Sequence, residues 1–216
     1  MDDKTKQTQH LENLIEIRSI MEHSSRFISL SGLSGVLAGI FALIGAAVAF
    51  WYFNYEFYTP ELFNQIFDYR GYPLPDFLIF LFVDAGLVFV FSLFFAIILT
   101  TRKAKKSGHK IWSKAVKQML SALIIPVVTG GIFCIVLLFY GAIFLIAPVT
   151  LIFYGLALLN ASKYTLNDIK YLGIIEILLG LTACFIPGYG LLIWAVGFGV
   201  FHILYGIIMY YKYEKK

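Results

Sequence analysis

The sequence predicts an all-α membrane protein with six transmembrane helices, and three observations support this prediction. The 216 residues are 60% hydrophobic and only 14% charged, whereas a soluble domain carries roughly 25% charged residues. The apolar residues form long runs of about 18 residues or more, enough for a helix to cross roughly 30 Å of hydrocarbon. The basic residues lie almost entirely between these runs, on one side of the predicted membrane.

The chain divides into a polar N-terminal segment, residues 1–26, a transmembrane domain, residues 27–211, and a basic tail, residues 212–216. We predict six spans within the domain from its apolar runs. They lie at about 27–53, 76–100, 118–139, 142–160, 168–187 and 190–211. Only the sequence FYGA, residues 139–142, separates the third span from the fourth. A bent re-entrant pair is the alternative there, but two spans fit the length better.

Residues 8–25 predict an amphipathic helix in the cytoplasm, because Leu11, Leu14, Ile17 and Met21 share one helical face. The acidic and basic residues of this segment nearly balance, so it lacks the basic face of a helix that lies on lipid. We expect the helix to dock on the cytoplasmic side of its own bundle. The alternative is that it pairs with a protein partner or with a second copy of the chain.

The outer loop, residues 54–75, predicts a short helix at the membrane surface. Thr59 has the position of an N-cap, Pro60 that of the first helical residue, and Gly71 follows the end. The many aromatic residues of this loop are typical of the belt that forms at a membrane interface. A lid over an outward-facing cavity is the alternative interpretation.

Lysine and arginine determine the predicted orientation. If the N-terminus is inside, Arg70 is the only one of the 17 basic residues outside. The others are Lys4, Lys6, Arg18, Arg26, Arg102, Lys103, Lys105, Lys106, Lys110, Lys114, Lys117, Lys163, Lys170, Lys212, Lys215 and Lys216. The positive-inside rule therefore predicts a multi-pass protein of the cell membrane with both termini in the cytoplasm.

Several function classes find no support in the sequence. The basic run 102–117 lies directly between two predicted spans, so it indicates contact with anionic lipid rather than with nucleic acid. Cys134 and Cys184 lie in apolar runs without a CxxC or Cys/His pattern, and we expect no metal or other cofactor. No catalytic motif such as HExxH occurs. The chain is therefore not expected to be an enzyme.

The first predicted span contains a stripe of small residues. Ser31, Gly35 and Gly39 recur every four positions and so lie on one helical face. Small residues allow two transmembrane helices to approach closely. We therefore predict that another helix packs on this stripe.

The last two predicted spans each place an ionisable residue on a glycine-lined face, at matching spacings. The two triplets are Gly173, Glu176 and Gly180, and Gly199, His202 and Gly206. Residues at these spacings share one face of an α-helix. In an antiparallel hairpin the carboxyl and the imidazole lie at one depth, so we predict that the glycine faces meet and bring Glu176 and His202 into contact.

Asp84 lies within the second predicted span, and we expect it at a depth similar to that of this pair. Ionisable residues inside a membrane commonly bind ions or relay protons. Glu176, His202 and Asp84 therefore predict a small proton- or cation-linked transporter or channel. The alternative is a non-catalytic assembly or regulatory subunit, in which the polar pair and the glycines serve helix packing.

Residues 21–46, MEHSSRFISLSGLSGVLAGIFALIGA, resemble the opening of a group of uncharacterised bacterial membrane proteins with six spans. The resemblance implies a bacterial inner membrane. It transfers no activity and no functional residue to this chain.

Overall fold

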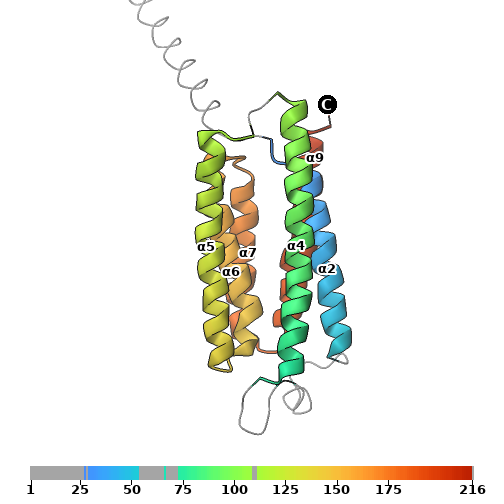
Figure 1. The fold of residues 1–216 in the computed structure, drawn as a ribbon, viewed down its shortest axis with the longest axis vertical. Coiled ribbons are helices and arrows are strands. Elements are labelled where there is room, and N and C mark those ends of the chain that lie inside the picture. The colour runs from blue at the N-terminus through green and yellow to red at the C-terminus, as the bar shows by residue number, and fades with distance from the viewer. Residues whose placement is uncertain (1–26, 28, 54–65, 67–72, 109–110, 216) are drawn as a thin grey trace, which may run out of the picture.

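The computed structural model describes residues 27, 29–53, 66, 73–108 and 111–215 (Figure 1). These residues form helices and connecting turns, and no strand occurs among them. The all-α prediction is therefore confirmed for the described ranges. The amphipathic helix predicted at 8–25 and the helix predicted in the outer loop lie outside them, apart from Ile66.

Five helices of the described residues are long and apolar enough to cross a membrane. The first three are α2 (Gly32–Tyr52), α4 (Pro75–Lys106) and α5 (Lys114–Phe139). The fourth, Ile143–Tyr164, joins the short η1 (Ile143–Leu145), α6 (Ile146–Ala161) and the short η2 (Ser162–Tyr164). The fifth, Gly190–Tyr213, joins α8 (Gly190–Trp194), the π-helix η3 (Ala195–Phe201) and α9 (His202–Tyr213).

One further helix, α7 (Ile169–Phe185), has 17 residues and packs along α6. Glycines form the turn after α7 and the turn between α5 and α6. Gly141 after α5 and Gly188 before α8 both have positive φ, at 71° and 94°, a backbone conformation that glycine adopts without strain. The break predicted at residues 139–142 is therefore present.

The helices form two groups that lie side by side (Figure 1). In one group α6 packs against both α5 and α7, and in the other α2 packs against both α4 and the rod made by α8, η3 and α9. The apolar face of α4 that points away from α2 is largely exposed, and the side chains of Phe82, Phe89 and Phe94 are each more than half accessible. This pattern is opposite to that of a soluble protein and fits a helix that faces hydrocarbon.

The stripe of small residues on α2 lies against the last rod, as predicted. A Cβ atom added at Gly39 would lie 2.6 Å from the carbonyl oxygen of Gly199, and one added at Gly35 would lie 3.3 Å from the Cα of Gly206. Ser31, directly before α2, is also buried. The absence of side chains at these glycines brings the two backbones into direct contact.

The C-terminal end of the rod caps the first helix. The backbone N–H of Gly32 donates a hydrogen bond to Glu214 Oε1, at 2.5 Å. Lys103 Nζ lies 3.3 Å from the same oxygen and donates to the carbonyl of Leu30 at 2.6 Å. A carboxylate at a helix N-terminus satisfies a free N–H and interacts favourably with the helix dipole. Glu214 therefore joins α2, α4 and α9 at one end of the bundle.

Asp168, the residue before α7, makes a second connection at this end. Lys212 Nζ and the Tyr213 hydroxyl both donate to Asp168 Oδ2, each at 2.6 Å. Partial burial raises the pKa of Asp168, but these hydrogen bonds and the Lys212 charge outweigh it and hold the pKa below its ordinary value of 3.8. The folded state thus favours the ionised carboxylate, which connects α7 to α9.

This connection predicts an acid-dependent loss of stability. A carboxyl group whose pKa is lowered by folding stabilises the protein above its ordinary pKa, and this contribution is lost as the pH falls below 3.8 and through the lower folded value. The melting temperature of the purified protein, followed by circular dichroism, is expected to fall over this range. Asp168→Asn is expected to show a smaller fall, and an identical fall in both proteins would contradict the prediction.

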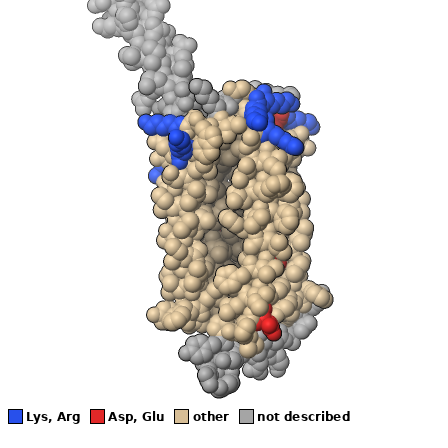
Figure 2. All heavy atoms as spheres, in the orientation of Figure 1, with Lys and Arg blue, Asp and Glu red and all other residues tan. Residues whose placement is uncertain are grey.

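Basic side chains gather at one end of the bundle (Figure 2). Helices that end or begin there carry Lys103, Lys105 and Lys106 in the last turn of α4, Lys114 at the start of α5, and Lys212 in the last turn of α9. The asymmetry seen in the sequence is therefore also an asymmetry in space.

Candidate functional site

Glu176 and His202 meet in the interior of the helix bundle. Glu176 lies midway along α7 with 0% of its surface exposed, and His202, the first residue of α9, is 5% exposed. His202 Nδ1 lies 3.2 Å from Glu176 Oε1. The two predicted residues are therefore in contact, and both are shielded from solvent.

The predicted reason for this contact is wrong, because the two glycine faces do not meet. Gly173 and Gly180 of α7 lie against α6, where an added Cβ would be 2.7 Å from the carbonyl oxygens of Gly155 and Pro148 respectively. Gly199 and Gly206 lie against α2 instead, close to Leu43 and to the backbone of Gly32. Each glycine stripe thus packs a helix onto a different neighbour.

The last rod is not α-helical up to His202, because residues 195–201 form the π-helix η3, a wider turn with i→i+5 hydrogen bonds. In this turn Gly197, rather than Gly199, lies against the acid. A Cβ added at Gly197 would be 2.5 Å from Glu176 Oε2 and 2.6 Å from Leu151 Cδ2. Gly197 therefore provides the space that the carboxyl group occupies.

Tyr154 of α6 completes the site, although it is not among the site residues predicted from the sequence. Its hydroxyl oxygen lies 3.0 Å from His202 Nε2. The Tyr154 ring also lies 5.3 Å from the imidazole and 4.9 Å from the ring of Phe198, measured between centroids. A tyrosine within an apolar span was the available signal, because a buried hydroxyl group usually finds a polar partner.

Together these contacts fix the orientation of the imidazole ring. Nδ1 lies 3.2 Å from the carbonyl oxygen of Gly197 and is oriented for a hydrogen bond to it, while Nε2 faces the Tyr154 hydroxyl. In the neutral ring, Nδ1–H donates to the carbonyl and Nε2 accepts from the tyrosine. If the imidazole is protonated, both ring nitrogens donate, and the positive charge lies next to Glu176.

The carboxyl group of Glu176 itself is left without a hydrogen-bond donor. Within the described part of the chain, neither of its oxygens has a hydrogen-bond partner, although Nδ1 lies within ion-pair distance. The Nδ1–H bond is directed at Gly197, so proximity to the acid is electrostatic rather than a hydrogen bond. A buried polar group without a partner costs about 1–3 kcal/mol, and more when it is charged.

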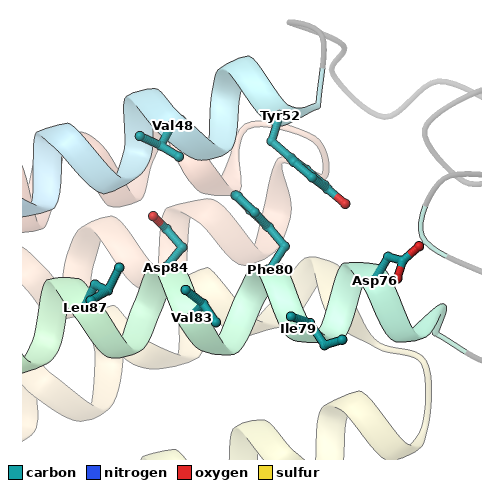
Figure 3. A pocket seen from close by; sticks show the side chains of 8 residues that line it. All are labelled: Val48, Tyr52, Asp76, Ile79, Phe80, Val83, Asp84 and Leu87. Atoms are coloured by element: carbon teal, nitrogen blue, oxygen red, sulfur yellow. The ribbon is translucent and has the colours of Figure 1, made fainter.

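Asp84 does not join this pair. The carboxyl oxygens of Asp84 on α4 lie beside Gly45 of α2, whereas the carboxyl group of Glu176 lies beside Gly197 of the last rod. Asp84 instead points into a groove between α2 and α4 (Figure 3). Among the described residues, no three His, Cys, Asp or Glu side chains are grouped so as to hold a metal ion.

No family model, curated protein or solved structure matches this chain. The function of the site is therefore inferred from its own geometry and from the fold around it.

Proposed function

We propose that the chain is an integral membrane protein with six spans and with both termini in the cytoplasm. The sixth span is α7, whose 17 residues extend about 26 Å. Its Gly173 lies beside Leu158 near the end of α6, and its Gly180 lies beside Pro148 near the start, so α7 runs antiparallel along α6. The basic end of the bundle then faces the cytoplasm, as the positive-inside rule requires.

Within this protein we propose that Glu176 and His202 bind and release a proton as part of a small proton-linked transporter. The observation that supports this role is the buried carboxyl group without a hydrogen-bond donor among the described residues. A polar pair that served only to hold helices together would satisfy its own hydrogen bonds. An acid that is left unsatisfied beside an imidazole is suited to change its protonation state.

The other residues of the site have supporting roles in this proposal. Tyr154 holds His202 Nε2, which leaves Nδ1 directed toward Gly197 and Glu176. Gly197 admits the carboxyl group and belongs to η3, a π-helical segment of the kind often found at functional sites. In this proposal the full burial of Glu176 corresponds to an occluded state, and proton exchange requires an opening movement.

Proton flux in liposomes tests this function. A pH-sensitive dye inside proteoliposomes reports the decay of an imposed pH gradient. Glu176→Gln keeps the shape of the side chain but cannot ionise, and His202→Ala removes its partner; each is expected to lower the flux at least about tenfold. Thr182→Val is the matched control on α7, since the Thr182 hydroxyl is exposed and bonds only to its own helix. Flux that survives both site changes would overturn the proposal.

An assembly or regulatory subunit is the second candidate, because the hydrocarbon-facing surface of α4 also offers a site for a partner helix within the membrane. Among the described helices, α4 packs mainly against α2 and leaves a long apolar face open. In that case the wild-type protein shows no more flux than empty liposomes, and Glu176→Gln changes only the melting temperature.

A further inference from the structure

A groove separate from the Glu176 site lies between α2 and α4 (Figure 3). It is near the start of α4, whereas the basic residues of this helix are in its last turn. Its volume is about 310 Å³, within the range of small-molecule sites. The groove is lined by Val48, Tyr52, Asp76, Ile79, Phe80, Val83, Asp84 and Leu87. Most of this lining is apolar or aromatic, which makes the acidic residues its distinguishing chemistry.

Asp84 is the residue of this groove that the fold does not explain. It is the tenth residue of α4, within the apolar span, where a carboxylate costs about 2.5–3.5 kcal/mol on insertion scales. Within the described part of the chain, its carboxyl group takes part in no hydrogen bond or ion pair. Its carboxyl group lies beside Gly45 of α2, where an added Cβ would be 3.4 Å from Asp84 Oδ2, an ordinary van der Waals distance.

An aromatic wall lies next to this carboxylate. The rings of Tyr52 on α2 and Phe80 on α4 are stacked, with centroids 3.9 Å apart and planes at 7°. Phe80 is one helical turn from Asp84, and both side chains point toward α2 (Figure 3). Aromatic faces attract cations, and the attraction is stronger away from water.

From this combination we propose that the groove binds a lipophilic organic cation, with Asp84 as its counter-ion and with Tyr52 and Phe80 as its aromatic wall. A hard metal ion would need about six oxygen ligands, and the two carboxylates and one phenol of the groove do not form such a set, since Asp76 and Asp84 are eight residues apart, about 12 Å along α4. An organic cation needs one opposite charge and apolar surface, and the groove offers both. The proposal does not depend on proton transfer at Glu176.

Asp76 provides a contrast within the same groove. It lies in the first turn of α4, where a carboxylate is stabilised by the free N–H groups and by the helix dipole. Its position therefore has a structural reason that Asp84 lacks. For this reason Asp76→Asn is a matched control for Asp84→Asn.

Calorimetric titration of the purified protein with benzyltrimethylammonium tests the proposal. Asp84→Asn is expected to weaken binding at least about tenfold and to raise the melting temperature, because a charge leaves the membrane span. Asp76→Asn is expected to change the affinity less than about threefold, and Glu176→Gln to leave it unchanged. Neopentylbenzene, the neutral molecule of the same shape, is expected not to compete.

Three results would overturn this inference: wild-type protein that does not bind the cation, equal affinity in wild type and Asp84→Asn, or equal competition by the neutral analogue. None of them bears on the proton site, because Glu176 and His202 lie on other helices. Loss of proton flux in Glu176→Gln together with unchanged cation affinity would show that the two sites act separately.

Discussion

Replacing Gly206 with alanine is expected to destabilise the bundle by about 1–3 kcal/mol, as overpacking does. The new Cβ atom would lie 2.6 Å from the carbonyl oxygen of Gly32 and 2.6 Å from the backbone nitrogen of Val36. Both atoms belong to the backbone of α2, so the clash is relieved only if α2 and α9 separate. The melting temperature of the purified protein in detergent, followed by circular dichroism, measures this loss.

Gly131→Ala is the matched control for this change. Gly131 lies inside α5, and a Cβ added there meets no heavy atom within 4 Å. Alanine is favoured over glycine in a helix interior by about 1 kcal/mol, so this variant is expected to be as stable as the wild type or more stable. Equal destabilisation by the two changes would show that α2 and α9 are not in backbone contact.

The predicted features that the structure bears out are those that depend on long runs of residues. A single apolar run satisfies its backbone hydrogen bonds in a bilayer only as a helix. The all-α architecture therefore follows from the long apolar runs of the sequence. The stripe of Ser31, Gly35 and Gly39 also identified its contact, since small residues every four positions define a face whatever lies opposite. Neither inference needed knowledge of which helices are neighbours.

The helix geometry around Glu176 and the neighbour of each glycine face could not be predicted from the sequence. Gly197, rather than Gly199, lies at the acid, within the π-helix of residues 195–201, and nothing in the apolar sequence of this segment indicates a π-helix. The neighbour of each glycine face is likewise a property of the whole bundle. The predicted contact between Glu176 and His202 nevertheless formed, because two buried polar groups at one depth have few other partners.

The neighbours of Asp84 also depend on how the helices pack. Depth along one span does not determine which helix a side chain meets, and Asp84 of α4 lies beside Gly45 of α2 rather than beside Glu176. Contacts between spans are set by the packing of the whole bundle.

The second large effect is expected for Gly197→Ala, which places a methyl group inside the site. Its Cβ would lie 2.5 Å from Glu176 Oε2 and 2.6 Å from Leu151 Cδ2, and Leu151 is 0% exposed. Both close atoms are the ends of fully buried side chains, so we expect these side chains to shift at a cost of about 1–3 kcal/mol, which displaces the carboxyl group from His202. Proton flux in liposomes is expected to fall as it does in Glu176→Gln.

A double-mutant cycle separates this local clash from general damage to the fold. If the methyl group collides with the carboxyl group, Gly197→Ala costs less stability when Glu176 is already alanine, because the colliding atoms are gone. The expected coupling between the two changes is about 0.5–3 kcal/mol. Gly206→Ala is expected to show no such coupling to Glu176→Ala, since its clash is with α2. Simple additivity of Gly197→Ala with Glu176→Ala would mean that Gly197 does not hold the acid in place.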